Sequence, residues 1–208
     1  MKEKRVVKMA LAVILGLLAL LICQFLTGAG VATLMWKHWP TPDSTEVWFD
    51  AARLQVRDLP RGWHYVGGYI ENVPGAEARS FWYYGPPGED KPWVKVFEEI
   101  ILYPSPQAAV DAYEGWVDTY IPPDYREEWI QPPGVESHSR ADQMVVACLS
   151  GYVNGMHHYA CRAIGRYGNV VVVLLANVFD DRWLTMADFQ AVLEAMDLRI
   201  VAALGSIP

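Results

Sequence analysis

The sequence predicts an α+β protein, in which an N-terminal transmembrane helix precedes an antiparallel β-sheet domain with packed helices. Three observations lead to this fold class. Residues 9–36 form an uncharged run of 28 residues behind a basic start. Beyond it, short apolar segments between Pro- and Gly-rich turns predict strands, and segments with apolar residues every three or four positions predict helices. The expected order outside the membrane is α-βββ-α-βββ-α, and short turns between consecutive strands indicate an antiparallel sheet.

We divide the chain into three parts on this basis. Residues 1–36 are expected to form a cytoplasmic stub and the transmembrane helix, residues 37–60 a juxtamembrane segment, and residues 61–208 an extracytoplasmic domain. A bilayer core needs roughly 20 apolar residues, so the run is long enough to span it. Four of the first eight residues are Lys or Arg, which favours a cytoplasmic N-terminus. We therefore expect a single-pass protein of the cell membrane whose C-terminal domain faces the periplasm or the extracellular space.

Two other readings of the N-terminal run are weighed against an anchor. Small residues around Ala32 would suit cleavage of a signal peptide, but the apolar core before them exceeds the usual length of about 7–15 residues. Cys23 follows a lipobox-like Leu-Leu-Ile sequence, although Ile22 stands where a small residue is expected. A retained anchor in the lipid bilayer is the favoured interpretation.

The predicted span has features of a helix that packs against other membrane helices. Small residues four apart allow close approach, and a polar amide gains from an interhelical hydrogen bond. These expected contact residues are Ala12, Gly16, Gln24, Gly28 and Ala32. The partners would be integral membrane protein subunits. The alternative is that small residues are common in membrane helices and one Gln is tolerated.

The first half of the outer domain reads as a helix and three strands. Ser44 can cap a helix from residue 46 to about 56, which Leu59-Pro60 ends. Strands are expected at residues 63–71, 78–84 and 92–103. Turn-forming segments rich in Pro, Gly and Asn separate these strands.

A second helix is predicted to start at Ser105-Pro106, with Ser as the cap and Pro in the first turn. Pro122-Pro123 ends it, and a Pro-rich loop over residues 121–134 follows. One face of the helix is apolar: Ala109, Tyr113, Trp116, Val117 and Tyr120.

Three further strands and a closing helix complete the prediction. The strands are expected at residues 143–153, 157–165 and 169–178, and the helix at 186–201. Thr185 and Asp188 resemble a capping box. The expected buried face of the helix is Phe189, Val192, Leu193, Met196 and Ile200. The third strand is almost wholly apolar, which predicts cover on both faces, either by helices or by another protein.

Cys148 and Cys161 are predicted to form a cross-strand disulfide. Asn154-Gly155 between them is typical of a two-residue hairpin turn, which pairs residues whose numbers sum to 309. The two cysteines satisfy this sum and fall on a non-hydrogen-bonded pair, within disulfide range. Such a bond agrees with an oxidising compartment. Zinc ligation with His157 and His158 is the alternative, although the ligand spacing is unusual.

Composition and motifs bear on the function classes. Of 17 Lys or Arg and 24 Asp or Glu, four and one lie in residues 1–36, so residues 37–208 carry a formal charge of −10. This charge argues against nucleic acid as a partner.

No known nucleophile elbow, phosphate loop or metal motif is found, so no enzyme activity, catalytic residue, metal or cofactor is expected. The pairs Glu98-Glu99 and Glu127-Glu128 are expected to be solvated, with Glu98 and Glu99 on opposite faces of a strand.

The predicted strands carry more aromatic residues than one face of a hydrophobic core needs, so some of them are expected to be available for protein contacts. They are Trp63, Phe81, Trp82, Tyr83 and Tyr84. Burial under the Pro-rich loops is the competing interpretation.

The layout resembles, at the level of the fold, PsbP/Mog1-like domains and bacterial extracytoplasmic sensor-type domains. The resemblance covers roughly residues 59–204, from Leu59-Pro-Arg-Gly-Trp63 through the helix at Ser105 and the cysteine strands to the closing helix. The small residues and Gln24 of the span, the surplus aromatic residues and the missing catalytic motifs favour a non-catalytic accessory or structural subunit of a larger bacterial membrane complex. By analogy, such a complex could serve electron transport, with alternative complex III as one candidate. The alternative is a ligand-binding or sensor module. Because only eight residues precede the span, such a module is expected to act through a partner protein.

Overall fold

The computed structural model of the chain describes residues 43–86, 95–132, 134–135, 139–153, 155–179 and 182–208. The chain divides into two compact units, residues 1–43 and 44–208. The predicted span lies outside the described residues, as do Ala12, Gly16, Gln24, Gly28 and Ala32. Within the described residues, no helix has the length and apolar character needed to cross a bilayer.

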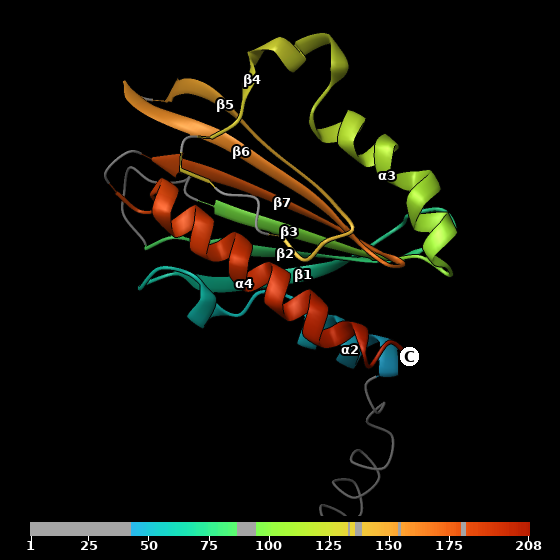
Figure 1. Cartoon of the computed structure of the whole chain (residues 1–208). Coiled ribbons are helices and arrows are strands. Elements are labelled where there is room, and N and C mark those ends of the chain that lie inside the picture. The colour runs from blue at the N-terminus through green and yellow to red at the C-terminus, as the bar shows by residue number, and fades with distance from the viewer. Residues whose placement is uncertain (1–42, 87–94, 133, 136–138, 154, 180–181) are drawn as a thin grey trace, which may run out of the picture. The chain divides into compact units, whose positions relative to one another are not determined.

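The second unit is built on one seven-stranded antiparallel sheet (Figure 1). The strand order is β1-β2-β3-β7-β6-β5-β4, so the last strand in the sequence lies beside the third. The strands are β1 (His64–Glu71), β2 (Glu77–Tyr84), β3 (Lys95–Leu102), β4 (Trp129–Ile130), β5 (Gln143–Val153), β6 (Met156–Tyr167) and β7 (Val170–Phe179). The predicted α+β class with an antiparallel sheet is confirmed.

Helices cover both faces of the sheet. The helices α2 (Ser44–Ala52) and α4 (Met186–Leu204) lie together on one face, and α3 (Pro106–Tyr120) lies apart from them (Figure 1). The residues of α2 and α4 belong to one hydrophobic cluster and those of α3 to another. Two short 3-10 helices, η1 (Val56–Asp58) and η2 (Pro123–Glu128), follow α2 and α3. We refer to the two faces as the α4 face and the α3 face.

Strand β7 is the centre of the sheet and confirms the prediction of cover on both faces. Val172 and Leu174 pack in the cluster of α2 and α4, whereas Val171 and Val173 pack in the cluster of α3. All four are fully buried. Burial of each such side chain stabilises the fold by about 1.5–3 kcal/mol relative to exposure. The helices of the chain itself supply this cover.

The helix caps follow the predicted pattern. Ser105 caps α3 by accepting a hydrogen bond from the Ala108 N–H, and Thr185 and Asp188 form a capping box on α4. Helix α4 extends one turn beyond its predicted end, to Leu204. All five residues predicted for its buried face are buried: Phe189, Val192, Leu193, Met196 and Ile200. Asp197 and Ala203 are buried as well.

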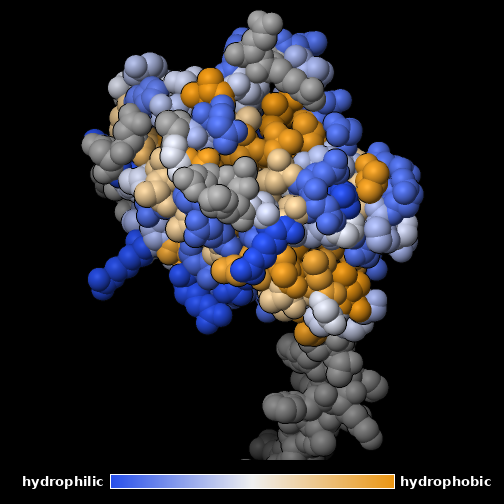
Figure 2. Space-filling model, in the orientation of Figure 1, coloured by the Kyte–Doolittle hydropathy of each residue, from blue (hydrophilic) through white to orange (hydrophobic). Residues whose placement is uncertain are grey.

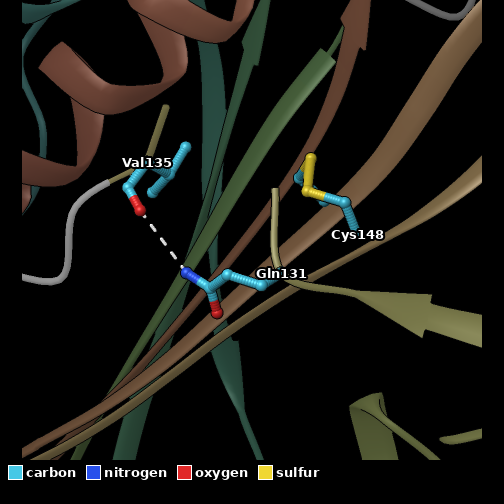
Figure 3. The surroundings of a disulfide bond; sticks show 4 residues. Gln131, Val135 and Cys148 are labelled. Carbon is cyan, nitrogen blue, oxygen red and sulfur yellow. Dashed lines mark hydrogen bonds between the residues drawn. A yellow bond between two sulfur atoms is a disulfide. The ribbon is translucent and has the colours of Figure 1, made fainter. Parts of the chain in front are cut away.

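The disulfide between Cys148 and Cys161 is confirmed (Figure 3). The two residues are register partners on β5 and β6, and their Cα atoms are 4.0 Å apart. Strand β4 lies on the other side of β5, where Ile130 pairs with Cys148. Beyond β4 the chain folds back, and the Gln131 side-chain amide donates a hydrogen bond to the Val135 carbonyl at 3.4 Å. Neither β4 nor η2 was expected, because residues 121–134 read as a loop.

Residues 44–63, which precede β1, belong to the same compact unit as the sheet. Helix α2 begins at Ser44, and Trp48 and Phe49 are buried against the sheet and α4. The Trp48 indole N–H donates a hydrogen bond to the Ala203 carbonyl at 2.9 Å, which joins the first helix of the unit to its last. The helix ends at Ala52, four residues before the predicted end near residue 56.

Candidate functional site

The adjacent carboxyls of β3 point to opposite faces of the sheet, as predicted, but both are buried. Glu98 is 0% exposed and Glu99 is 5% exposed, so the expectation of solvated charge is wrong for this pair. The reason is the position of β3, which lies beside the central strand with helices over both of its faces. Glu128 of the second pair is exposed, and the side chain of Glu127 lies outside the described set.

Glu98 is the most unusual side chain on the α4 face. Its Oε2 accepts a hydrogen bond from the Leu54 N–H at 2.8 Å, just after α2. Its Oε1 is buried and has no hydrogen-bond partner among the described residues. Burial raises the pKa of Glu98 to about 8, although the Leu54 N–H and the nearby guanidinium of Arg53 act in the opposite direction. This carboxyl can therefore bind or release a proton near neutral pH.

Tyr83 and Arg53 surround the same segment. The Tyr83 hydroxyl donates a hydrogen bond to the Leu54 carbonyl at 2.5 Å, so both backbone groups of Leu54 are held by sheet residues. Burial raises the pKa of Tyr83, and the charge of Glu98 raises it further. The Arg53 guanidinium lies 4.5 Å from the centre of the Tyr65 ring and bonds Asp50. Protonation of Glu98 therefore affects a hydrogen bond that attaches the chain between α2 and η1 to the sheet.

An ion pair attaches the end of this segment to α4. Asp58 of η1 accepts two hydrogen bonds from the guanidinium of Arg199, one of them at 3.1 Å. Burial alone would raise the pKa of Asp58, but Arg199 and the Gln55 N–H hold it below its ordinary value. The pair borders a groove of about 430 Å³ between α2, η1 and α4, whose rim includes the exposed Leu198. Hydrophobic side chains gather on the surface over these helices (Figure 2).

Glu99 occupies the corresponding position on the α3 face. Its Oε2 accepts a hydrogen bond from the Tyr120 hydroxyl at 2.9 Å. Burial raises the pKa of Glu99, which lowers the fraction that is charged near neutral pH. Beside it, the Arg162 guanidinium of β6 lies 5.9 Å from the Tyr120 ring centre and 5.0 Å from that of Trp129. Arg162 is thus held between aromatic rings on the sheet surface.

The aromatic residues proposed for protein contacts divide between the two faces. Trp63, Phe81 and Tyr83 are 3%, 6% and 0% exposed in the core of the α4 face, so they are not available to a partner. Trp82 and Tyr84 alternate with them and are partly exposed on the α3 face. Sequence reasoning missed the two cations on this face, Lys95 and Arg162. Strand alternation could have placed each cation on a face, but it could not have shown that both lie near the same row of side chains, Phe97 and Leu175.

A cavity lies at the end of the sheet near the start of α2. Its volume is about 710 Å³, and it is lined by the start of α2, the β1–β2 turn, the end of β3, the β6–β7 turn and the last residues of the chain. Asn169 in this lining donates a side-chain hydrogen bond to the Tyr103 carbonyl at 2.9 Å. Among the described residues that line it, Glu77 has the one charged side chain. The cavity is a candidate for a small neutral or cationic ligand.

The described residues do not support the zinc alternative. Both sulfurs are joined in the disulfide, and no group of three or more His, Cys, Asp or Glu side chains suited to a metal occurs in the described part of the chain. The two histidines have other contacts. The His157 Nε2 lies 2.9 Å from the Ser150 hydroxyl, and the ring of His158 stacks on that of Phe179.

Comparisons with known proteins inform the fold. Neither a scan against protein-family models nor a search of curated proteins gives a match. Among solved structures, the chain is similar to the extracellular domain of PknH from Mycobacterium tuberculosis, with a TM-score of 0.52 and 9% sequence identity. The match covers 74% of this chain and 94% of that domain. The two structures therefore share a fold, which is all that this likeness shows. The finding does not extend to the PsbP/Mog1-like part of the expected resemblance or to alternative complex III.

Proposed function

We propose that this chain is an extracytoplasmic ligand-binding or sensor module that acts through a partner protein. The observation that carries the proposal is the fold, which spans nearly the whole extracellular domain of PknH. The Cys148–Cys161 disulfide supports an oxidising compartment outside the cytoplasm. The transmembrane anchor over residues 9–36 remains a prediction and would hold the module at the membrane. Neither the fold nor the comparison supports a complex subunit or a role in electron transport.

The proposed role is binding, without a reaction of its own. Two regions of the described unit suit a ligand: the cavity of about 710 Å³ and the partly exposed α3 face. The segment around Leu54 suits a conformational response, since a few specific hydrogen bonds attach it to the sheet.

Thermal unfolding of the full chain in mild detergent tests this proposal. A ligand present at 100 times its dissociation constant stabilises the folded state by about 2.7 kcal/mol. For a domain of this size that corresponds to a rise in Tm of roughly 5–10 °C. The screen should include small metabolites and a peptide library. If no compound and no peptide raises the Tm, the binding function is wrong.

A further inference from the structure

Part of the α3 face is left uncovered by α3. The cluster around that helix includes Ile101, Val171 and Ile164, at the end of the sheet near the β6–β7 turn. Further along the same strands lie Trp82, Lys95, Phe97, Arg162 and Leu175, which we call the open face. All but Phe97 are partly exposed, and Phe97 is 8% exposed. Trp82 and Phe97 belong to neither hydrophobic cluster.

The strand register fixes how the two cations of the open face are arranged. Arg162 pairs with Leu175, and Leu175 pairs with Phe97, so these three lie in one row across β6, β7 and β3. Lys95 lies two residues from Phe97 along β3. Two strand spacings and two residue rises place the Cα atoms of Lys95 and Arg162 about 12 Å apart. The apolar side chains of Phe97 and Leu175 lie between them.

Neither cation has an acidic partner among the described residues. The Lys95 ammonium lies 5.1 Å from the centre of the Trp82 ring, and the Arg162 guanidinium rests on Trp129 and Tyr120. Burial lowers the pKa of Arg162, because desolvation disfavours the charged guanidinium. An unpaired, partly buried guanidinium is rare because desolvation of a charge is costly. It presents a fork of donors that matches a carboxylate.

The shape of the open face limits what it can bind. The hollow between Trp82, Lys95, Phe97 and Leu175 has a volume of about 60 Å³. Pockets for small molecules are typically several times larger, roughly 300–1,000 Å³. A hollow of this size accepts one apolar side chain. Exposed Trp, Tyr and Arg are the residues that dominate binding energy at protein interfaces.

We propose that the open face binds an acidic segment of a partner protein. One carboxylate of that segment bonds Arg162, a second acidic side chain lies near Lys95, and an apolar side chain fills the hollow over Trp82 and Phe97. Charge complementarity supports this partner, because the open face carries two cations without an acidic partner among the described residues, on a chain with a formal net charge of −7. The inference rests on the proposed function and names the chemistry of the partner.

Selection from a random peptide library identifies which peptide sequences the open face binds. The full chain in mild detergent is the target, and the affinity of the most enriched peptide is then measured by fluorescence anisotropy. We expect the enriched peptides to carry an excess of Asp and Glu with at least one large apolar residue. Arg162→Gln and Lys95→Gln should each weaken binding about 10-fold, and raised salt should weaken it further. Trp82→Ala should weaken binding at low and high salt alike.

Arg140→Gln is the matched control, because Arg140 is exposed and its backbone N–H donates a hydrogen bond to Asp197 of α4, which covers the other face of the sheet. It should bind the peptide like the wild type. Thermal unfolding of each variant separates lost binding from lost folding. The inference is overturned if the enriched peptides lack acidic residues, or if folded R162Q and K95Q bind as well as R140Q. If no peptide binds but a small molecule raises the Tm, the inference fails and the proposed binding function stands.

Discussion

Replacement of Glu98 by Gln tests the role assigned to the buried carboxyl. In the wild type, the pKa of Glu98 is raised from its ordinary value of 4.5 to about 8. A carboxyl with a raised folded-state pKa favours folding when it is protonated, so its contribution is complete below about pH 4.5. That contribution is lost as the pH rises toward 8. Glu98→Gln removes the titration and keeps an acceptor oxygen for the Leu54 N–H.

The expected size of the effect follows from the same shift. Each pKa unit corresponds to about 1.4 kcal/mol, so the pH-dependent loss attributable to Glu98 amounts to a few kcal/mol. The full burial of the side chain means that solvent screens this effect little. The free energy of unfolding of E98Q should therefore fall less between pH 5 and pH 9 than that of the wild type. Any destabilisation caused by the amide of E98Q itself is the same at both pH values, so it cancels when the change with pH is compared between the variant and the wild type.

Urea unfolding of the full chain in detergent at pH 5, 7 and 9, followed by tryptophan fluorescence, measures the difference. Glu114→Gln, on the exposed side of α3, is the control and should track the wild type at every pH. If the gap in unfolding free energy between E98Q and the wild type is the same at all three pH values, Glu98 does not titrate in this range. The interpretation of the buried carboxyl would then be wrong.

Three further changes probe the fold. Reduction of the Cys148–Cys161 bond should lower the free energy of unfolding by about 3 kcal/mol, as expected for a loop of this length, and equal urea midpoints with and without reductant would contradict this. Asp58→Asn should lower the free energy of unfolding by about 1–3 kcal/mol at pH 7. Because folding lowers the pKa of Asp58, the difference in unfolding free energy from the wild type should shrink as the pH falls below about 4. Thr185→Ala should cost about 1 kcal/mol through loss of the α4 cap, whereas Thr185→Ser should cost much less in the same melts.

The parts of the fold that were predictable are those controlled by local chemistry. The turn at Gly155 has a positive φ of 75°, and the pairing of Val153 with Met156 sets the register that brings Cys148 opposite Cys161. The capping box at Thr185 is equally local. Strand β4 was not predictable, because two residues carry no periodicity and their pairing depends on where β5 lies.

The candidate sites were harder to predict because they depend on the order of the strands. Glu98 lies between Val96 and Ile100, both fully buried, so alternation placed it toward the core even though Glu usually lies in solvent. Its pairing with Leu54 needed the fold of the segment after α2. Lys95 and Arg162 lie on either side of Leu175 because β7 inserts between β3 and β6. No local pattern in the sequence predicts that β7 lies between β3 and β6.

The hydrogen bond between Trp48 and Ala203 has a consequence for synthesis of the domain. The two residues are 155 positions apart, yet they join the first and last helices of the folded unit. At about 5–20 residues per second, α2 is made roughly 8–30 s before α4 is complete. During that interval Trp48 and Phe49 have no α4 to pack against, and the α4 face of the sheet lacks its main helix. The nascent domain is therefore most vulnerable to aggregation just before its last turn of helix is made, and premature termination within α4 leaves this aromatic surface exposed.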